Sequence, residues 1–368
     1  MRVHQIVPRL DMGDAVSHQA LSIHHLLQSW GFDSRIYATG VDDFGRRYAA
    51  PDADYAAFMG KKEDILIYHY LLYCGNVEMY LRSSNRKVLV YHNITPPEFY
   101  RGFHQPLYQA CALGREMLAF LVDCELALGD SEYNRRELVE AGFPEEKTGV
   151  LPINPTTGRL DGVTEDRRLL EKLSDGRVNL LFVGRLVPHK KVDDVIRLFA
   201  AYCRGVNARS RLILVGNPIT SYQVALASLC KKLAVEDRVV MTGKVSDGAL
   251  KAFYLASRYY ISMSEHEGFC VPILEAFHFG LPVLAYAAAA VPETMGGAGV
   301  LFDRKDFPLL AELLGRLDRD EVTRRRIVEA QRRRLLDFSE EVFEERLRRL
   351  LGPLLGLEVE MDEVLAGG

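Results

Sequence analysis

Two glutamates, Glu267 and Glu275, occur in the stretch SEHEGFCVPILEAFHFGLPVLAY with seven residues between them. Proline is favoured in the first turn of a helix, so Pro272 predicts a helix that begins there, and Gly280 predicts its end. The residues between are apolar on almost every side, which is typical of a buried helix. Glu275 is therefore a carboxylate inside a buried helix. It needs polar partners, because desolvating an unpaired charge is costly.

The entrance of this predicted helix has the features of an anion site. The backbone N–H groups of Phe269, Cys270 and Val271 have no acceptor within the helix, and the helix dipole attracts negative charge. A phosphate could bind these amides, with a carboxylate on each side to accept hydrogen bonds from hydroxyl groups. The structural alternative is an acidic residue beside a helix and a second glutamate paired with a buried arginine. The two glutamates alone do not decide between these interpretations.

A basic segment, Gly184-Arg185-Leu186-Val187-Pro188-His189-Lys190-Lys191, follows the apolar run NLLFVG. It would place a guanidinium group and an ammonium group beside the end of a buried strand. Arginine offers phosphate a planar fork, and lysine offers it a mobile point charge. Isolated charges of this kind usually lie on the surface without a ligand, so the segment alone is a weak signal for phosphate binding.

A glycine turn near the N-terminus is a second weak signal. In PRLDMGDAVSHQAL, Gly13 would let the backbone approach a ligand closely, and Asp14 or Ser17 could cap the helix that follows. The segment has one glycine instead of the dinucleotide fingerprint Gly-x-Gly-x-x-Gly.

The elements that must position these segments are strands. Short β-rich runs alternate with helical patterns, which is typical of parallel sheets built from strand-helix-strand units. Ligands of such folds bind outside the carboxyl ends of the strands, which is where the segments above fall. The predicted strands form two groups of six, Val3–Val7, Arg35–Ala38, Ile65–His69, Val88–His92, Leu126–Gly129 and Val150–Pro152, then Asn179–Val183, Arg211–Val215, Arg238–Met241, Tyr259–Met263, Val283–Tyr286 and Gly299–Phe302.

Two groups of strands predict two domains. The chain has 368 residues, and single cores usually stop growing at about 250–300 residues. Between the groups, LPINPTTGRLDGVTEDRR is rich in Pro, Gly, Thr and charge without clear periodicity, which is typical of a linker. We expect one domain over residues 1–155, a second over 175–335, and C-terminal helices over 336–368 that pack back toward the first domain.

Composition excludes several classes of protein. A hydrophobic content of 48%, a charged content of 26% and a net charge of −4 are typical of a soluble globular protein without a nucleic-acid surface. The six cysteines show neither close pairing nor metal-ligand spacing, which indicates a reduced cytoplasmic protein with buried thiols. No apolar run approaches the roughly 18 residues of a membrane span, and peripheral attachment is left open. The basic C-terminal end is interpreted as helices that dock on the protein's own surface.

Taken together, these segments resemble the retaining GT-B glycosyltransferases of family 4. The strongest match is the Glu-x7-Glu element from Glu267 to Glu275. The other matches, which together span nearly the whole chain, are Gly184-Arg185-Leu186-x-Pro188-x-Lys190, Leu214-Val215-Gly216, Thr242-Gly243-Lys244-Val245, and LALGDSEYNRREL with Ser131 and Glu132. The resemblance implies an α/β GT-B fold, with two tandem Rossmann-like doubly wound domains that face each other across a cleft.

The resemblance also implies roles for single residues. It assigns the ribose hydroxyls of a nucleotide sugar to Glu275 and the hydroxyls of the donor sugar to Glu267. It assigns the diphosphate to Arg185 and Lys190, with Lys191 as the alternative to Lys190.

Further donor contacts follow from the same resemblance. The nucleobase would meet the backbone at Lys244 and Val245. His92 in VLVYHN would face the donor sugar, with His69 in ILIYHY as a second candidate. The remaining donor-binding positions are the two glycine turns and the helix entrance, Gly13, Gly184, Phe269, Cys270 and Val271.

Several loops depart from the family pattern at glycine positions. Cys270 replaces the glycine after Phe269, and Lys191 stands where many relatives have glycine. In AAAAVPET, alanines replace a Gly-Gly pair, so a glycine conformation cannot be assumed at Ala289-Ala290. Gly13-Asp14-Ala15 replaces the Gly-Gly of the first loop, which leaves its diphosphate contact open.

The function expected from the resemblance is transfer of a sugar from a UDP- or GDP-sugar to a hydroxyl group, with retained configuration, in polysaccharide, lipopolysaccharide or glycoconjugate biosynthesis. The acceptor would be a glycan, a lipid-linked molecule or a small molecule, and the location cytoplasmic, at the inner membrane face if the protein is attached there. In this family the acceptor attacks the front face of an oxocarbenium-like donor, and the leaving phosphate takes the acceptor's proton. Two alternatives stay open: a nucleotide-sugar epimerase or phosphorylase on the same fold, and a non-catalytic nucleotide-sugar-binding subunit.

No cofactor and no metal is expected. A basic pair and helix-entrance amides can neutralise a diphosphate without a divalent cation. An Asp-x-Asp spacing does occur in Leu317–Glu321, and it is interpreted as the solvated surface of a charged helical region.

Overall fold

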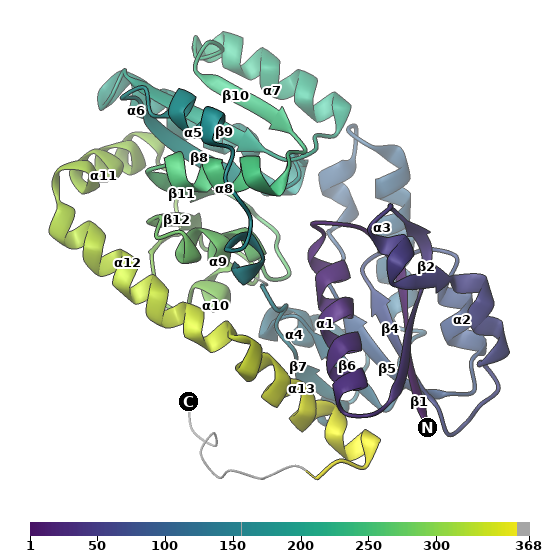
Figure 1. Cartoon of the computed structure of the whole chain (residues 1–368). Helices are drawn as coiled ribbons and strands as arrows, with labels where there is room; N and C mark the ends of the chain where they lie inside the picture. The colour runs from purple at the N-terminus through teal and green to yellow at the C-terminus, as the bar shows by residue number, and fades with distance from the viewer. Residues whose placement is uncertain (156, 359–368) are drawn as a thin grey trace.

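Two parallel sheets organise the chain, which the computed structural model describes over residues 1–155 and 157–358 (Figure 1). The first sheet has seven strands in the order β3-β2-β1-β4-β5-β6-β7, and the second has six in the order β10-β9-β8-β11-β12-β13. In each sheet the chain starts in the middle, proceeds to one edge and then reverses, which is the order of a doubly wound fold. The prediction of two tandem Rossmann-like domains is confirmed.

Every strand predicted from the sequence overlaps an observed strand. The first sheet contains β1 (Arg2–Leu10), β2 (Asp33–Val41), β3 (Ala49–Pro51), β4 (Ile65–Tyr70), β5 (Arg86–Tyr91), β6 (Leu126–Gly129) and β7 (Thr148–Val150). The second contains β8 (Val178–Val183), β9 (Ser210–Val215), β10 (Val239–Gly243), β11 (Tyr259–Ser262), β12 (Val283–Tyr286) and β13 (Val300–Phe302).

The prediction of six strands in the first sheet is wrong by one. The sequence missed β3, an edge strand of three residues that pairs with β2 and is too short to show an alternating pattern. In addition, β7 lies two residues before the predicted Val150–Pro152.

Helices connect the strands and cover the sheets. Those that follow strands of the first sheet are α1 (Ala15–Ser29), α2 (Val77–Arg82), α3 (Gln105–Leu118) and α4 (Glu132–Glu140). The second part of the chain contains α5 (Arg167–Leu173), α6 (Val192–Gly205), α7 (Thr220–Leu233), α8 (Asp247–Ala256), α9 (Val271–His278), α10 (Val291–Met295), α11 (Phe307–Arg319), α12 (Glu321–Leu335) and α13 (Glu340–Leu355). Among the described residues, no helix combines the length and apolar character needed to cross a membrane.

The last two helices run from the second domain to the first. Figure 1 shows α12 along one side of the molecule and α13 beside the first sheet. On α13, Phe343, Leu347 and Leu351 are buried in a cluster that includes Val3 of β1 and Val88 of β5. The C-terminal segment therefore contacts the first domain through apolar burial, while residues 359–368 of the predicted third segment lie outside the described residues.

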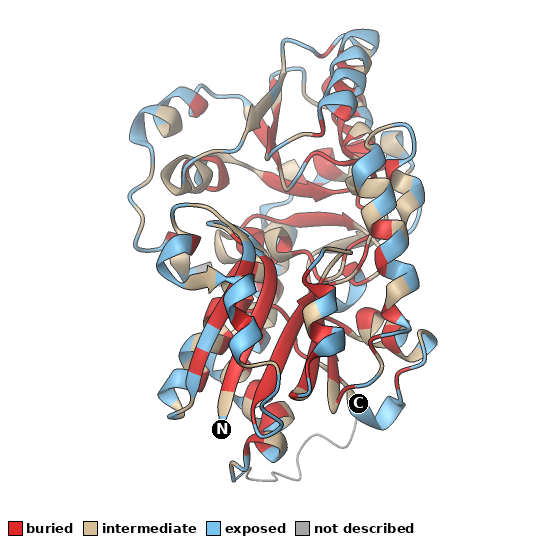
Figure 2. Cartoon of the chain, turned by 90° about the vertical axis from the view of Figure 1, so that its right-hand side faces the viewer, coloured by how far each residue is buried: buried red, intermediate tan, exposed pale blue. Residues whose placement is uncertain are grey.

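The core follows the strands. Figure 2 shows that the central strands of both sheets are mostly buried, because helices cover parallel sheets on both faces. All six residues of β4 are buried, including His69, which is the polar exception in the run ILIYHY. A polar side chain inside such a strand must find its partners within the protein.

Candidate active site

An ion pair between Lys190 and Glu267 lies at the carboxyl ends of the second sheet. Lys190 follows β8 and Glu267 follows β11, and these two strands are neighbours at the point where the strand order reverses. Lys190 Nζ lies 2.7 and 2.8 Å from the two carboxylate oxygens of Glu267. Burial lowers the pKa of Lys190, but the carboxylate outweighs burial and raises it overall, so the ammonium group stays charged.

The entrance of α9 lies against this ion pair. The helix begins at Val271, one residue before the predicted start, with Pro272 in its first turn. Cys270 is the N-cap residue and offers no side-chain cap. Burial raises the pKa of its thiol, with Glu267 adding to this effect and Lys190 opposing it. The backbone N–H groups of Cys270 and Val271 find no acceptor within the described part of the chain, which leaves them available to an anion.

Glu275 is held one turn inside α9. Its side chain is almost fully buried, and Oε2 accepts a hydrogen bond of 2.7 Å from the hydroxyl of Tyr254 on α8. Arg159 Nη2 lies 3.8 Å from Oε1. Burial raises the pKa of Glu275, and Tyr254 and Arg159 oppose this rise. The alternative in which Glu275 pairs with an arginine is therefore met in part, because Arg159 lies near its carboxylate. The sequence offered no signal for either partner, because both lie far away along the chain.

The turn after β8 presents Gly184 and Arg185. A Cβ atom at Gly216, which follows the neighbouring strand β9, would lie 2.1 Å from the Gly184 carbonyl oxygen, so only glycine fits at that crossing. The Arg185 side chain is exposed and forms no ion pair with any described residue. Its charge acts on Tyr100 and Cys111 of the first domain. Arg185 is thus an exposed cation close enough to the first domain to act on its side chains.

Lys190 and Lys191 point to different places. Lys190 reaches Glu267, whereas Lys191 Nζ lies 3.4 Å from Asp193 and 3.8 Å from Asp194, both on α6. Of the two lysines, the structure brings Lys190 to Glu267.

Three residues at positions where the resemblance led us to expect glycine adopt the left-handed backbone conformation. Their φ angles are 48° at Lys191, 75° at Cys270 and 49° at Ala289. Ala289 thus takes the glycine-like conformation that could not be assumed from the sequence. An L-residue in this region costs about 1–2 kcal/mol, so the loops keep their path in spite of their side chains.

The segment predicted to meet a nucleobase follows β10. The Lys244 N–H donates to Asn217 Oδ1 at 3.1 Å, so this amide already has a partner. Val245, the next residue, is half-buried and packs against the core of the second domain.

The Gly13 turn lies opposite the second domain. Gly13 has φ 77° and is exposed. Asp14 caps α1 by accepting the Ser17 N–H at 2.9 Å, which confirms the predicted helix start. Ala15, in the first turn of α1, packs against the core cluster of the second domain, so the turn stands at the seam between the domains.

His92 lies inside the first domain instead of on the surface of the cleft. Its side chain is 1% exposed, its Nε2 lies 2.8 Å from His69 Nδ1, and its Nδ1 lies 3.0 Å from Asp130 Oδ2. Both ring nitrogens of each histidine therefore have partners within the first domain, and a contact of His92 or His69 with a donor sugar stays a prediction. The His92 carbonyl oxygen does face the second domain, 3.4 Å from the Cβ position of Gly268.

A chain of hydrogen bonds sets the protonation of these histidines. Gln5 Nε2 donates to the Ala20 carbonyl, so Gln5 Oε1 must accept from His69 Nε2–H. Burial lowers the pKa of His69 well below its usual value, so the ring is neutral and its Nδ1 accepts from His92 Nε2–H. His92 Nδ1 and Asp130 therefore share a single proton.

The first domain touches the Glu267 loop at Gly268. Asn134 Nδ2 donates to the Gly268 carbonyl at 3.3 Å. A Cβ atom at this position would lie 2.7 Å from Asn93 Cβ, so the close approach of the domains requires glycine.

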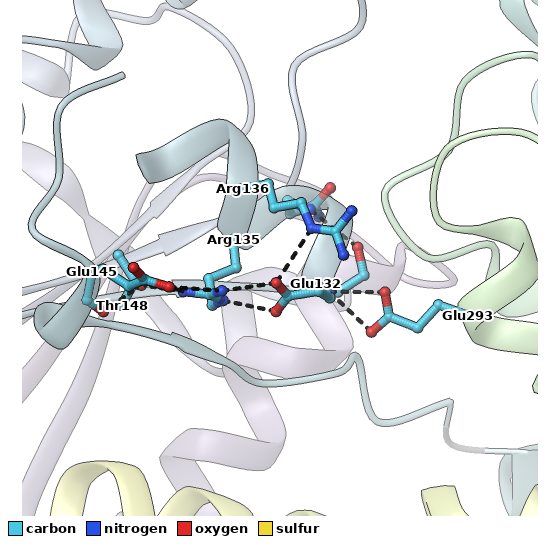
Figure 3. Close-up of polar contacts among 8 residues, drawn as sticks. Glu132, Arg135, Arg136, Glu145, Thr148 and Glu293 are labelled. Atoms are coloured by element: carbon cyan, nitrogen blue, oxygen red, sulfur yellow. Dashed lines mark hydrogen bonds and ion pairs between the residues drawn. The ribbon is translucent and has the colours of Figure 1, made fainter. Parts of the chain in front are cut away.

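A second contact between the domains involves two glutamates (Figure 3). Both oxygens of Glu293, on α10, accept the backbone N–H of Glu132 at 2.9 and 2.8 Å. Glu132 is the first residue of α4, so the carboxylate of Glu293 occupies the positive end of that helix. The Glu132 side chain turns away and pairs with Arg135 and Arg136.

Two histidines that the sequence left without a role flank the ion pair. His189 precedes Lys190, His266 precedes Glu267, and both are buried. His189 Nδ1 and His266 Nε2 have no hydrogen-bond partner among the described residues. Burial lowers the pKa of His189 far below its usual range and that of His266 to about 4, so both rings are neutral. Each packs against Phe99 of the first domain, with ring centroids 6.1 and 6.5 Å away. The sequence signal that could have identified these two histidines is that each one directly precedes a predicted site residue, Lys190 or Glu267.

The Asp-x-Asp spacing serves helix packing. Asp318 accepts hydrogen bonds of 2.5 and 2.8 Å from the hydroxyls of Tyr202 and Tyr259, and Asp320 caps α12. The interpretation as a solvated surface is therefore wrong for Asp318. Over residues 1–155 and 157–358, no group of three or more His, Cys, Asp or Glu side chains is arranged to hold a metal ion.

The arrangement of the two sheets is that of known GT-B proteins. Over 96% of this chain and all of the other, the structure superposes on Anabaena HepE in complex with UDP and glucose, with a TM-score of 0.72 and 17% identity. WaaG, a glycosyltransferase involved in lipopolysaccharide biosynthesis, gives a TM-score of 0.71 at 15% identity, over 95% of this chain and all of WaaG. The fold is therefore GT-B, with two Rossmann-like domains.

The second domain also matches a family by sequence. Residues 165–334 match the family Glycosyl transferases group 1. O-antigen chain mannosyltransferase B of Escherichia coli is 25% identical over 60% of this chain and 58% of its own length. D-inositol 3-phosphate glycosyltransferase of Actinosynnema mirum is 32% identical over 49% of this chain and 45% of its own length. The chain thus spans about half the length of the curated relatives it matches.

Proposed function

We propose that this protein is a retaining glycosyltransferase that moves a sugar from a UDP- or GDP-sugar to a hydroxyl group of an acceptor. The observation that carries the proposal is the convergence of Lys190, Glu267 and the unpartnered amides of Cys270 and Val271, with Glu275 one turn inside the same helix. The match of residues 165–334 to Glycosyl transferases group 1 supports it. So do the names of the relatives, which describe sugar transfer in O-antigen and inositol-phosphate chemistry.

Each group has a task in this reaction. The diphosphate would lie on the α9 amides between Lys190 and Arg185, which stabilise the charge that develops as the diphosphate leaves. Glu267 would accept hydrogen bonds from the donor sugar and Glu275 from the ribose. The leaving phosphate oxygen would take the acceptor's proton, so the proposed reaction needs no protein carboxylate as nucleophile.

The acceptor would enter from the side of the first domain. Arg185 faces that domain and Asn134 contacts the Glu267 loop, so a bound acceptor hydroxyl would meet the anomeric carbon at the seam. We propose a glycan, a lipid-linked molecule or a small molecule as acceptor.

The test is a transfer assay with UDP- and GDP-sugars, chosen by thermal shift, in the presence of excess chelator. Nuclear magnetic resonance of the anomeric proton of the product should show retained configuration, and activity should persist without divalent metal. A product of inverted configuration, or turnover without an acceptor, would contradict the proposal. Activity that disappears in chelator and returns with magnesium would contradict its metal-independent form.

A further inference from the structure

The segment that leaves the first domain is fastened to the second domain beside Glu275. Lys251 Nζ on α8 donates to the carbonyl oxygens of Leu160, Asp161 and Val163 at 2.9, 3.1 and 2.9 Å. His278, at the end of α9, lies 2.6 Å from Asp161 Oδ1. The Leu160 side chain is buried in the second domain's core. These hydrogen bonds and the burial of Leu160 fix the position of the preceding residue, Arg159.

The guanidinium group of Arg159 lies between two carboxylates. Nη1 forms an ion pair with Asp247 at the start of α8, and Nη2 lies 3.8 Å from Glu275 Oε1. The side chains of Arg159 and Asp247 are 20% and 22% exposed, and that of Glu275 is 11% exposed. A cation from the linker thus stands between two acidic groups that would otherwise repel each other.

The charged groups around Glu275 show why this cation matters. Burial raises the pKa of Glu275, and Asp247 raises it further. The groups that oppose this are the Tyr254 hydroxyl, Arg159 and His278. Of these three, Arg159 is a permanent cation, because Tyr254 is neutral and a histidine is charged only when it is protonated.

The first domain also faces this arginine. His18, on α1, is half-buried, and the charge of Arg159 adds to the effect of burial in lowering its pKa. Asp14, the cap of α1, acts on His18 in the opposite direction. Arg159 therefore stands where the linker, the two helices of the second domain and α1 meet.

We propose that Arg159 is a positioning residue for nucleotide binding, which keeps Glu275 ionised and directed so that its carboxylate can accept hydrogen bonds from two ribose hydroxyls. The inference rests on the proposed function, since it assigns a ribose to Glu275. A carboxylate is acceptor-only, whereas a protonated carboxyl group must donate one hydrogen and loses an acceptor site. Arg159 acts through Glu275 and needs no contact of its own with the ligand.

The test compares the pH dependence of nucleotide binding between matched variants. The probes are UDP and GDP, measured by calorimetry from pH 7.5 to 5.5. The variants are Arg159→Met, Arg159→Lys and, as a control, Arg167→Met, which removes an exposed arginine that pairs with Glu165 among the described residues. A nearby opposite charge lowers the pKa of a carboxyl group by about 1–3 pH units. Without the charge of Arg159, nucleotide affinity should therefore begin to fall at a higher pH as the solution is acidified. The titration of the nucleotide phosphate is common to all variants and cancels in the comparison.

We expect the dissociation constant of Arg159→Met to rise about tenfold more between pH 7.5 and 5.5 than that of Arg167→Met. Arg159→Lys should restore most of the original pH profile, because it restores the charge. If Arg159→Met does not fold, Arg159→Gln replaces it, with unfolding temperatures measured for every variant.

The outcomes separate this inference from the proposed function. If neither UDP nor GDP binds the unmodified protein, the proposed function fails. If nucleotide binds and Glu275→Gln weakens it, but Arg159→Met keeps the original pH profile, the inference about Arg159 is overturned. An equal loss of nucleotide affinity at every pH, without rescue by lysine, would also overturn it, since that pattern indicates that Arg159 only stabilises the fold.

Discussion

The ammonium group of Lys190 lies within 2.8 Å of both carboxylate oxygens of Glu267, although one residue follows β8 and the other β11. The residue expected to bind phosphate and the residue expected to bind sugar therefore neutralise each other. A diphosphate would give Lys190 a second anionic partner and release part of the Glu267 carboxylate for hydroxyl groups. The pair thus keeps both charges in place within a largely buried site.

This pairing predicts a stability effect as well as a loss of activity. Lys190→Ala removes the cation that pairs with Glu267, whose side chain is 8% exposed, and this should cost about 3 kcal/mol of unfolding free energy and lower the turnover number by about a hundredfold or more. The double variant Lys190→Ala with Glu267→Ala should recover part of the stability but none of the activity. Urea unfolding and steady-state kinetics measure the two effects. Lys191→Ala is the control, and an equal loss of activity there would show that the wrong lysine was assigned.

Glu275→Ala should weaken nucleotide binding by about 1.5–3 kcal/mol, because the ribose hydroxyls lose a charged acceptor. The matched variant is Tyr254→Phe, which removes one hydrogen bond to Glu275 and leaves the carboxylate in place. Calorimetry at one fixed pH should show a much smaller loss of nucleotide affinity for Tyr254→Phe than for Glu275→Ala. Unchanged affinity in Glu275→Ala would remove this glutamate from the donor site.

Glycine should stabilise the protein at its left-handed positions. Ala289 and Ala234 have φ angles of 49° and 55°, where glycine avoids the steric cost of Cβ. Ala289→Gly and Ala234→Gly should each raise the free energy of unfolding by about 0.5–1 kcal/mol, less than the full steric cost, because glycine also gains entropy in the unfolded chain. The control is Ala225→Gly, an exposed position inside α7, where glycine should cost about 1 kcal/mol. A destabilised Ala289→Gly would mean that its methyl group makes contacts that outweigh the backbone strain.

His4 should make the protein sensitive to acid. Its ring is 1% exposed among Tyr37, Tyr55 and Phe58, and neither nitrogen has a partner among the described residues. Burial lowers its pKa to about 4, so below pH ~6.5 the unfolded chain binds a proton that the folded protein does not, and stability falls with pH down to about 4. His4→Phe removes this pH-dependent loss of stability, together with two polar atoms that have no partner among the described residues.

We expect His4→Phe to be more stable at pH 7 by about 1 kcal/mol, and its advantage to grow by up to about 1.4 kcal/mol per pH unit on acidification from 6.5 to 4. Urea unfolding at pH 7, 6 and 5 measures this difference. A constant difference across the three pH values would show that His4 is protonated equally in the folded and unfolded states.

The sequence by itself determined every strand except β3, the division into two domains and the residue types of the proposed site. Strand and helix patterns are local, so β8 and the entrance of α9 could be predicted, and Glu267, Glu275 and Lys190 could be named. The tertiary structure decided which of these groups meet. It paired Lys190 with Glu267, enclosed His92 between His69 and Asp130, and brought Arg159 and Tyr254 to Glu275. These contacts join segments far apart in the chain, and burial then sets their charge states, so no local pattern could have revealed them.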